Sequence, residues 1–147
     1  MNITLCGSIA FYDEMLSVKN HLEQLNHTVQ LPPSKITNEN GKPLSVKEYY
    51  EIRKKETSEI SWVWTSKQKA MKAHLDKVAW SDCVLVINHA KNNISGYIGA
   101  NTLIEMGLAL HLNKKIFLFN EVPQLSYTEE IRGMNPTIIN GELTLIH

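Results

Sequence analysis

The sequence of 147 residues predicts a doubly wound α/β fold, in which helices cover both faces of a mainly parallel sheet of about four or five strands. Short apolar runs with strand character alternate along the chain with longer segments of helical periodicity. The run from Asp82 to Ile87 is apolar after its first residue, as is typical of a strand covered on both faces. We expect a single domain over 1–147, since this length can bury one core and no domain boundary is visible.

The first half of the chain supplies two predicted strands, two helices and a long loop. In chain order these are a strand over Asn2 to Cys6, a helix from about Phe11 to Leu25, a strand over His27 to Leu31, a loop over Ser34 to Pro43 and a helix over Val46 to Ile60. Because the loop is polar and long, it is expected to be mobile or to act as a lid. The last helix is rich in charge and is interpreted as outward-facing, its charges being solvated surface.

The second half alternates in the same way. Its predicted elements are a helix from about Lys67 to Trp80, a strand over Asp82 to Ile87, a helix over Thr102 to Leu110, a strand over Lys115 to Phe119, a short helix over Tyr127 to Met134 and one or two strands within Thr137 to Ile146. Thr65 or Ser66 is the expected N-cap of the first of these helices. Trp62 and Trp64, just before it, either stack on a nucleobase or cover the core, and we favour the core.

Composition restricts the partners. Fifteen basic residues balance fifteen acidic ones, so duplex nucleic acid and anionic membranes are not expected partners, whereas small molecules or proteins are. The N-terminus lacks the pattern of a signal peptide and no apolar run is long enough to span a membrane, which predicts a cytoplasmic protein. Cys6 and Cys83 fall in buried strands and are expected to be free thiols that behave as small hydrophobic groups.

Metal and cofactor motifs are absent from the sequence. None of the six histidines has a companion in an H-E-x-x-H or C-x-x-C pattern, so we predict no metal. The glycine patterns of dinucleotide-binding and P-loop proteins are missing as well, so we predict no nucleotide cofactor.

Glu105 is the only residue with a full formal charge between Lys91 and Lys114, in a segment that otherwise reads as buried. An ionised carboxylate is costly to bury unless another group pairs with it or the reaction uses it. Thr102-Leu103-Ile104-Glu105 fits the capping box, in which the Glu side chain binds the N-cap backbone. Glu105 is therefore either a helix cap or a reagent, and the glycine-rich loop before it, which gives a ligand close access, favours the reagent.

The predicted ligand site lies at the carboxyl ends of the strands, where doubly wound proteins bind their ligands. The segments expected there are Gly7-Ser8, Asn88 to Thr102, and the chain from Asn120 onward. Gly7-Ser8 offers backbone N–H groups and a hydroxyl at a helix start, which suits a phosphate or a sugar hydroxyl, although the same pair also makes a plain tight turn.

Four stretches of the chain carry a resemblance to a known family. They are Leu5-Cys6-Gly7-Ser8-Ile9, Asp82-x-x-Leu85-Val86 followed by Asn88, Gly99-x-Asn101-Thr102-x-x-Glu105-Met106-Gly107-x-Ala109, and Lys115-x-Phe117-Leu118. Together they resemble the nucleoside 2-deoxyribosyltransferase superfamily, which includes the 2'-deoxynucleoside 5'-phosphate N-hydrolases. The implied fold is a flavodoxin-like or Rossmann-like three-layer sandwich, in agreement with the pattern of elements.

The resemblance implies cleavage or transfer of an N-glycosidic bond. Glu105 would attack the anomeric carbon and form a glycosyl-enzyme ester, which another base or water then takes. Asp82 matches the family's second acid and would assist protonation, although on its own it reads as a cap at a strand start. The implied substrate-binding residues are Cys6, Gly7, Ser8, Asn88, Gly99, Asn101 and Thr102. The resemblance also implies a homo-oligomer, in which Asn135 to Asn140 would serve a neighbour's site.

Gly99 departs from the family pattern, because many transferases carry an Asp six residues before the nucleophile. The missing Asp argues against base exchange on free deoxynucleosides and leaves hydrolysis, or a phosphorylated or modified substrate, open. Gly7-Ser8, with Lys91 or Arg132, would then receive the phosphate. Two alternatives stay open. One is a nucleotide-binding or sensing module that has lost the chemistry, and the other is a glycohydrolase of a ribosyl cofactor such as NAD.

Overall fold

Five parallel strands form one sheet in the order β2-β1-β5-β6-β7. The computed structural model describes residues 1–147 and places the strands at β1 (Asn2–Gly7), β2 (Thr28–Gln30), β5 (Cys83–Ile87), β6 (Lys115–Leu118) and β7 (Thr137–Ile138). The winding reverses between β1 and β5, the point at which a doubly wound sheet opens a crevice at its carboxyl edge. The predicted fold class is confirmed.

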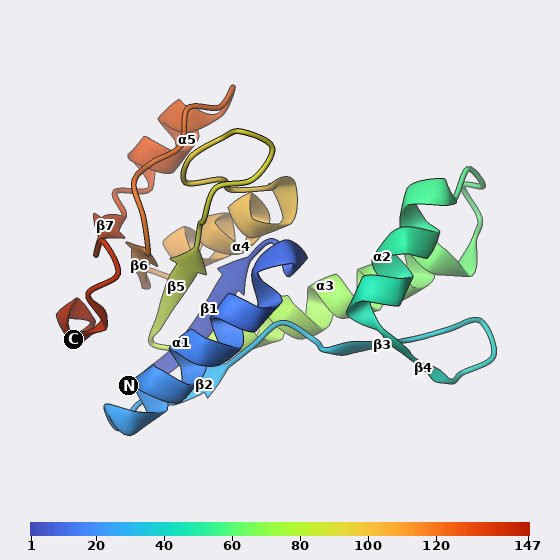
Figure 1. The fold of residues 1–147 in the computed structure, drawn as a ribbon, viewed down its shortest axis with the longest axis horizontal. Coiled ribbons are helices and arrows are strands. Elements are labelled where there is room, and N and C mark those ends of the chain that lie inside the picture. The colour runs from blue at the N-terminus through green and yellow to red at the C-terminus, as the bar shows by residue number, and fades with distance from the viewer.

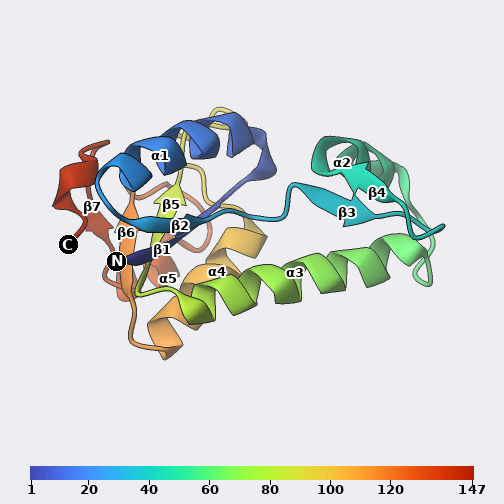
Figure 2. The ribbon, with the colours of Figure 1, turned by 90° about the horizontal axis from the view of Figure 1, so that it is seen from below.

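Helices cover both faces of this sheet (Figures 1 and 2). The helix α1 (Tyr12–Gln24), preceded by a 3-10 turn over Ile9–Phe11, packs on one face, where the 3-10 helix Leu143–Leu145 joins the same core cluster. The other face carries α3 (Trp62–Trp80), α4 (Ala100–His111) and α5 (Thr128–Gly133). The result is a three-layer sandwich with a separate core on each side of the sheet.

Alternation along β1 decides which side chains meet which helices. Ile3 and Leu5 lie in the core beneath α1, whereas Cys6 lies in the core beneath α3 and α4. In a strand, successive side chains point to opposite faces, so Leu5 and Cys6 contact helices on opposite sides of the sheet. Cys6 is therefore directed toward the helix that carries Glu105.

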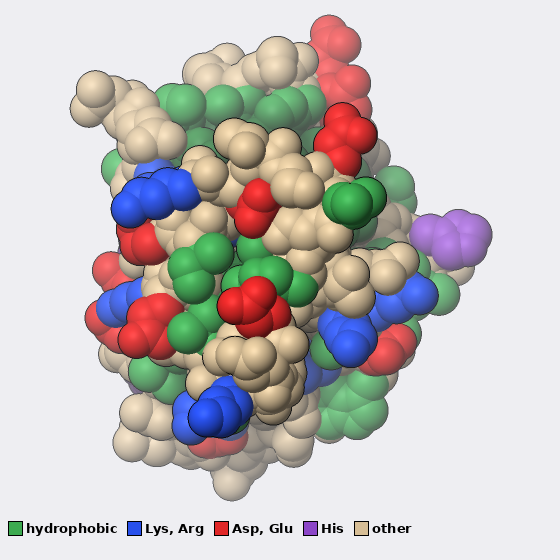
Figure 3. Space-filling model, turned by 90° about the vertical axis from the view of Figure 1, so that its right-hand side faces the viewer, with side chains coloured by type: hydrophobic (Ala, Val, Ile, Leu, Met, Phe, Trp, Pro, Cys, Tyr) green, Lys and Arg blue, Asp and Glu red, His purple; other side chains and the backbone are tan.

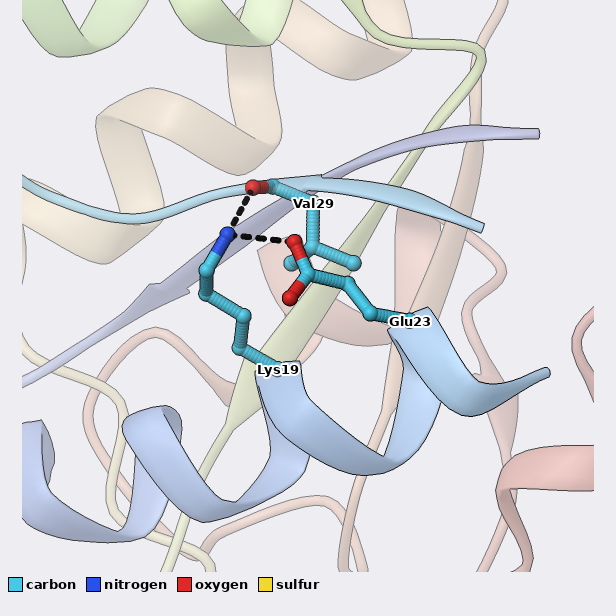
Figure 4. A network of polar contacts seen from close by, with 3 residues as sticks. All are labelled: Lys19, Glu23 and Val29. Carbon is cyan, nitrogen blue, oxygen red and sulfur yellow. Dashed lines mark hydrogen bonds and ion pairs between the residues drawn. The ribbon is translucent and has the colours of Figure 1, made fainter. Parts of the chain in front are cut away.

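A small polar network ties α1 to the edge strand β2 (Figure 4). The Lys19 ammonium donates to Glu23 Oε1 at 2.6 Å, one helical turn on, and to the backbone oxygen of Val29 at 2.8 Å. Because both side chains are partly exposed, the ion pair contributes only about 0 to 1 kcal/mol. Its main effect is to hold the edge strand against its helix.

An arm extends from the body of the protein along α3 (Figure 2). It consists of the antiparallel pair β3 (Lys35–Thr37) and β4 (Pro43–Ser45), the helix α2 (Val46–Lys55), and the first turns of α3. Tyr49 of α2 donates to the backbone oxygen of Val63 at 2.6 Å, and Ser66 donates to the backbone oxygen of Thr37 at 2.9 Å. The helix and the hairpin are thereby both fastened to α3.

The outer face of the arm carries charges of both signs. Figure 3 shows Lys and Arg interspersed with Asp and Glu on the side of the molecule that lies at the right of Figure 1, without a field of one sign.

The arm is also where the structure departs most from the sequence prediction. The segment expected to be a loop, Ser34 to Pro43, supplies the strand β3 and enters β4. The helix α3 begins at Trp62 instead of Lys67, because the side chain of Ser61 accepts from the Val63 amide at 3.2 Å and caps the helix there. The helix α2 ends at Lys55 instead of Ile60.

The remaining elements lie within a few residues of their predicted bounds. At the C-terminus the chain forms one strand, β7, and a 3-10 helix rather than a second strand. Asn140 and Gly141 both have positive φ, as the predicted turn requires. Both cysteines are buried free thiols. None of the helices combines the length and the apolar character that a membrane span needs.

Candidate active site

A pocket of about 340 Å³ lies between the carboxyl edge of the sheet and the arm. The body contributes the end of β1 with the residues after it, the loop after β5, and the first two turns of α4. The arm contributes β3, α2 and the inner side of α3. The pocket therefore stands at the predicted sheet edge, but half of its wall comes from a part of the chain that the sequence did not assign to it.

Glu105 lies in this pocket with only 14% of its side chain exposed. The helix α4 begins with Gly99 as its N-cap and has no side-chain cap, so Thr102 is already inside the helix. A capping box would need Thr102 itself at the N-cap position. The interpretation of Glu105 as a helix cap is therefore wrong.

Burial raises the pKa of the Glu105 carboxyl group. Removal from water raises the pKa of its carboxyl from 4.5 to about 8, although the adjacent Cys6 thiol and the charge of Lys67 work in the opposite direction. At neutral pH the resting carboxyl therefore holds its proton. A raised pKa in a cleft is typical of a functional acid.

His74 is the nearest titratable neighbour of Glu105. It comes from α3, its side chain is 4% exposed, and its Nε2 lies 3.7 Å from Oε2 of Glu105. Burial, together with the charge of Lys77, lowers the pKa of His74 to about 4, against the opposing effect of a weak contact with the Leu5 backbone. Neither ring nitrogen of His74, nor Oε2 of Glu105, has a hydrogen-bond partner of normal geometry. Buried polar atoms of this kind are rare in folded proteins and call for a functional explanation.

Cys6 completes a compact group with these two side chains. Its Sγ, a ring nitrogen of His74 and a carboxylate oxygen of Glu105 all lie within 4.8 Å of one another. Burial raises the pKa of the Cys6 thiol well above its ordinary value, and the neighbouring Glu105 raises it further. Cys6, predicted to bind substrate, is instead a fully buried neutral thiol that does not line the pocket.

Three basic side chains line the same pocket. They are Arg53 of α2, Lys67 of α3 and Lys91 of the loop after β5. Lys91 donates to Ser8 Oγ at 2.9 Å, and its ammonium lies 5.1 Å from the ring centroid of Tyr97. Since Glu105 is the only acidic residue of the lining, the pocket favours an anionic ligand.

Five of the predicted binding residues line the pocket, namely Gly7, Ser8, Gly99, Asn101 and Thr102. Gly7 has a φ of +153°, and a Cβ there would lie 2.7 Å from the backbone oxygen of Ile87. Only glycine lets β1 turn away beside β5 at this point. The Ser8 hydroxyl, which accepts from Ala10 N and from Lys91, is held toward the pocket by these contacts.

Asn88, also predicted to bind substrate, does not line the pocket. It is fully buried; its side-chain NH₂ donates to the backbone oxygens of Asn120 and Glu121, and its Oδ1 accepts from the Asn120 amide. These bonds occupy the amide group and fasten the loop after β5 to the loop after β6. We therefore correct its role to that of a structural residue.

Asp82, predicted as the second catalytic acid, lies at the opposite edge of the sheet. It precedes β5, and its Oδ2 accepts from the Asn2 amide at 2.7 Å. The five residues of β5 separate it from the pocket edge by about 16 Å. Since parallel strands bind ligands at their carboxyl ends, an acid that opens a strand cannot reach the site. The resemblance misplaced this role.

We expect the steady-state rate of the Asp82→Asn variant to stay within about twofold of the rate of the unaltered chain. The change weakens a single exposed hydrogen bond, so unfolding should become easier by no more than about 1 kcal/mol. Steady-state rates and chemical denaturation of the variant measure both quantities. A loss of turnover without a loss of stability would return Asp82 to the catalytic group.

His74 and the basic and aromatic side chains that the arm contributes to the pocket were not predicted from the sequence. His74 has no companion in a metal motif, and Arg53 was interpreted as part of the solvated charge run of α2, whereas Tyr49 and Tyr50 were assigned no role. The two tryptophans do not line the pocket: Trp62 packs edge-on against Tyr49, and Trp64 donates to the backbone oxygen of Ser58. Arg132, suggested as a phosphate ligand, is exposed and lies outside the pocket.

Comparison with known proteins gave likenesses among solved structures only. No family model and no curated protein sequence matches the chain. A 2-deoxyribosyltransferase from Bacillus psychrosaccharolyticus aligns at 21% identity with a TM-score of 0.48, over 80% of this chain and 71% of that one. The CMP N-glycosidase BcmB of Clostridium botulinum aligns at 16% identity with a TM-score of 0.48, over 95% of this chain and 86% of that one. Because both TM-scores are below 0.5, neither likeness carries a conclusion about activity.

Proposed function

We propose that this chain cleaves the N-glycosidic bond of a 2'-deoxynucleoside or, preferentially, of its 5'-monophosphate, with Glu105 as the nucleophile. The observation that carries the proposal is the environment of Glu105. It is a buried carboxyl group in an open pocket; its Oε2 has no hydrogen-bond partner, and neither of its neighbours, His74 and Cys6, carries a charge that would pair with it. A carboxyl group in that setting costs stability, and its retention is explained if the reaction uses it.

The proposed chemistry follows the pattern of retaining glycosidases. A Glu105 oxygen forms a bond to the anomeric carbon while the bond from that carbon to the base nitrogen breaks, and the electron pair leaves with the base, which takes a proton from solvent. Water then hydrolyses the resulting ester and restores the carboxyl group. The oxocarbenium-like transition state is stabilised by the negative charge of Glu105 in a site of low dielectric.

Glu105 must lose its proton to solvent before it attacks, because His74, with a pKa of about 4, is too weak a base to take a proton from a carboxyl group with a pKa of about 8. The neutral imidazole of His74 lies 3.7 Å from the carboxyl oxygen, so a shift of under 1 Å lets it donate a hydrogen bond to the ionised carboxylate. This hydrogen bond orients the carboxylate for attack. Because a group beside the nucleophile lies on the nucleophile's face of the sugar, His74 does not protonate the leaving base on the opposite face.

The preference for a monophosphate rests on the charges of the pocket. Three basic side chains surround a lining with one acidic residue, and that residue holds its proton at rest. A phosphate with close to two negative charges therefore meets an electropositive site. The absence of an acid at Gly99, which distinguishes the chain from many transferases of the family it resembles, favours water as the acceptor.

The test is a set of reactions with the four common deoxynucleosides and their 5'-monophosphates, each with and without an added acceptor base, resolved by chromatography. We expect free base from at least one monophosphate without any acceptor, and a slower reaction or none with the matching nucleoside. A new nucleoside formed only with acceptor would identify a transferase. Binding of a nucleotide without release of base would support the non-catalytic module and contradict the proposal.

A parallel reaction with NAD separates the remaining alternative. Release of nicotinamide, with no base released from any deoxynucleotide, would replace the proposed substrate with a ribosyl cofactor. The same chromatographic method detects both products, so one assay compares the two substrate classes directly.

A further inference from the structure

Three of the side chains that metals bind most readily meet beneath the pocket. The thiol of Cys6, the imidazole of His74 and the carboxyl of Glu105 come from β1, α3 and α4 and present donor atoms within 4.8 Å of one another. Because they lie far apart in sequence, they form no local metal motif.

The histidine supplies a second and independent observation. The His74 side chain is more than nine-tenths buried, it lies against the pocket, and neither of its ring nitrogens has a hydrogen-bond partner of normal geometry, apart from a weak contact with the Leu5 backbone. A buried imidazole ordinarily donates from one nitrogen and accepts at the other. An unpaired nitrogen that faces a carboxyl oxygen and a thiol is in the position of a metal ligand.

The distances suit a small tetrahedral ion. With bonds of about 2.0 to 2.3 Å from zinc to nitrogen, oxygen and sulfur, the ligand atoms of a tetrahedral site lie about 3.3 to 3.7 Å apart. A nitrogen and an oxygen ligand with bonds of about 2.0 to 2.2 Å lie about 3.3 to 3.6 Å apart, so the distance of 3.7 Å between His74 Nε2 and Glu105 Oε2 has to shorten by only about 0.1 to 0.4 Å. The thiol has to approach by at most about 1 Å, which rotation of the Glu105 and His74 side chains can supply.

We propose that Cys6, His74 and Glu105 form a binding site for Zn²⁺, with the fourth coordination position open to the pocket. On binding, the thiol and the carboxyl each release a proton to solvent. The thiolate and carboxylate together then carry two negative charges, which balance those of the ion, while His74 binds as the neutral imidazole. Three protein ligands with one open position are typical of accessible zinc sites.

The charges around the group set the choice of metal. Lys67, on the same helix as His74, faces Glu105, and Arg53 faces Lys67 from α2. Both are repelled by a cation, which disfavours Mg²⁺ and Ca²⁺, since these also prefer sites made of oxygen ligands alone. Zinc gains enough from the thiolate and imidazole to overcome this repulsion.

The site, if Glu105 acts as proposed above, is inhibitory. A carboxylate oxygen bound to zinc no longer has its electron pair available for the anomeric carbon, and the ion occupies the pocket floor. Zinc then switches the chain off reversibly, and a chelator restores it.

The experiment measures metal binding directly, without substrate. The chelator-treated protein is titrated with Co²⁺, which replaces Zn²⁺ in such sites and gives a thiolate-to-metal absorption band, and then with Zn²⁺ in competition against a chromophoric chelator. We expect one ion per chain and a thiolate band. Cys6→Ser should abolish the band, and Cys6→Ser and His74→Gln should each weaken Zn²⁺ binding at least about 100-fold.

Cys83→Ser is the matched control, because Cys83 is the other buried thiol of the sheet, on β5 and facing the opposite core. It should retain the band and the affinity. A band that survives Cys6→Ser, or Zn²⁺ affinity that His74→Gln leaves unchanged, would overturn the site. Circular dichroism of each variant shows whether the fold is intact, and a variant that unfolds is replaced by Cys6→Ala or His74→Asn.

The readout separates this proposal from the proposed activity. If cobalt binds as expected but no deoxynucleotide releases base, the metal site stands and the glycosidase proposal fails. If base is released and neither metal binds, the reverse holds. If both hold, added Zn²⁺ should reduce base release in proportion to occupancy of the site, and a chelator should restore it.

Discussion

Glu105→Gln is expected to lower release of free base by at least about 1,000-fold while the fold stays intact. The amide has nearly the same shape as the carboxyl but cannot form the glycosyl ester. Because the capping box is absent, no helix-end contact is lost with the charge. The measurement is single-turnover base release from the best substrate of the deoxynucleotide set, with enzyme in excess so that slow turnover is still seen.

Glu130→Gln is a suitable control for that experiment, since Glu130 is an exposed residue of α5 outside the pocket. It makes the same chemical change and should keep the full rate. Undiminished base release by a folded Glu105→Gln chain would falsify the assignment of the nucleophile. Calorimetry with the same nucleotide shows whether binding survives, which separates a lost reaction from a lost pocket.

The second large effect is on stability against pH. Glu105 has a pKa of about 8 in the folded chain and about 4.5 when exposed, so the unfolded chain loses this proton first as pH rises. The free energy of unfolding therefore falls between these values. His74 acts in the other direction, because its pKa is lowered from 6.5 to about 4, and its contribution to folding is lost as pH falls through that range. The two effects oppose each other below pH 6.5.

Between pH 6.5 and 8, of these two residues only Glu105 still changes the free energy of unfolding with pH. At about 1.4 kcal/mol for each unit of pH, the unaltered chain should lose about 2 kcal/mol of unfolding free energy over this interval relative to Glu105→Gln. Denaturant titrations of both chains at several pH values, with a chelator present, measure the difference. Parallel pH profiles would mean that the carboxyl group is not desolvated as the structure indicates.

The fold could be predicted because its determinants are local. Apolar runs such as Cys83–Ile87 and the helical period of α1 read directly as elements, and their alternation leaves few topologies. The start of α3 was missed by five residues because Ser61, Thr65 and Ser66 are all acceptable caps. The choice among them depends on how the arm packs, notably on burial of Val63, which no local pattern reveals.

The site was predictable only in part, for a related reason. Glu105 stands out because a lone charge in an apolar helix needs an explanation in any fold. His74 does not, because a histidine on an amphipathic helix is ordinary until the facing residue is known. Asp82 was misassigned although the order of the elements already places it at the amino end of its strand, on the side of the sheet away from ligands.

The helix α3 runs without a break from the arm to the body, and its 19 residues span about 28 Å. The wall of the pocket that the arm provides is therefore supported by a continuous helix and has its shape before a ligand binds. Such a cavity selects by size and charge at first contact, and little conformational entropy is lost on association. Because Met71 and His74 line the pocket, loosening the middle of α3 should weaken ligand binding and also displace His74 from Glu105.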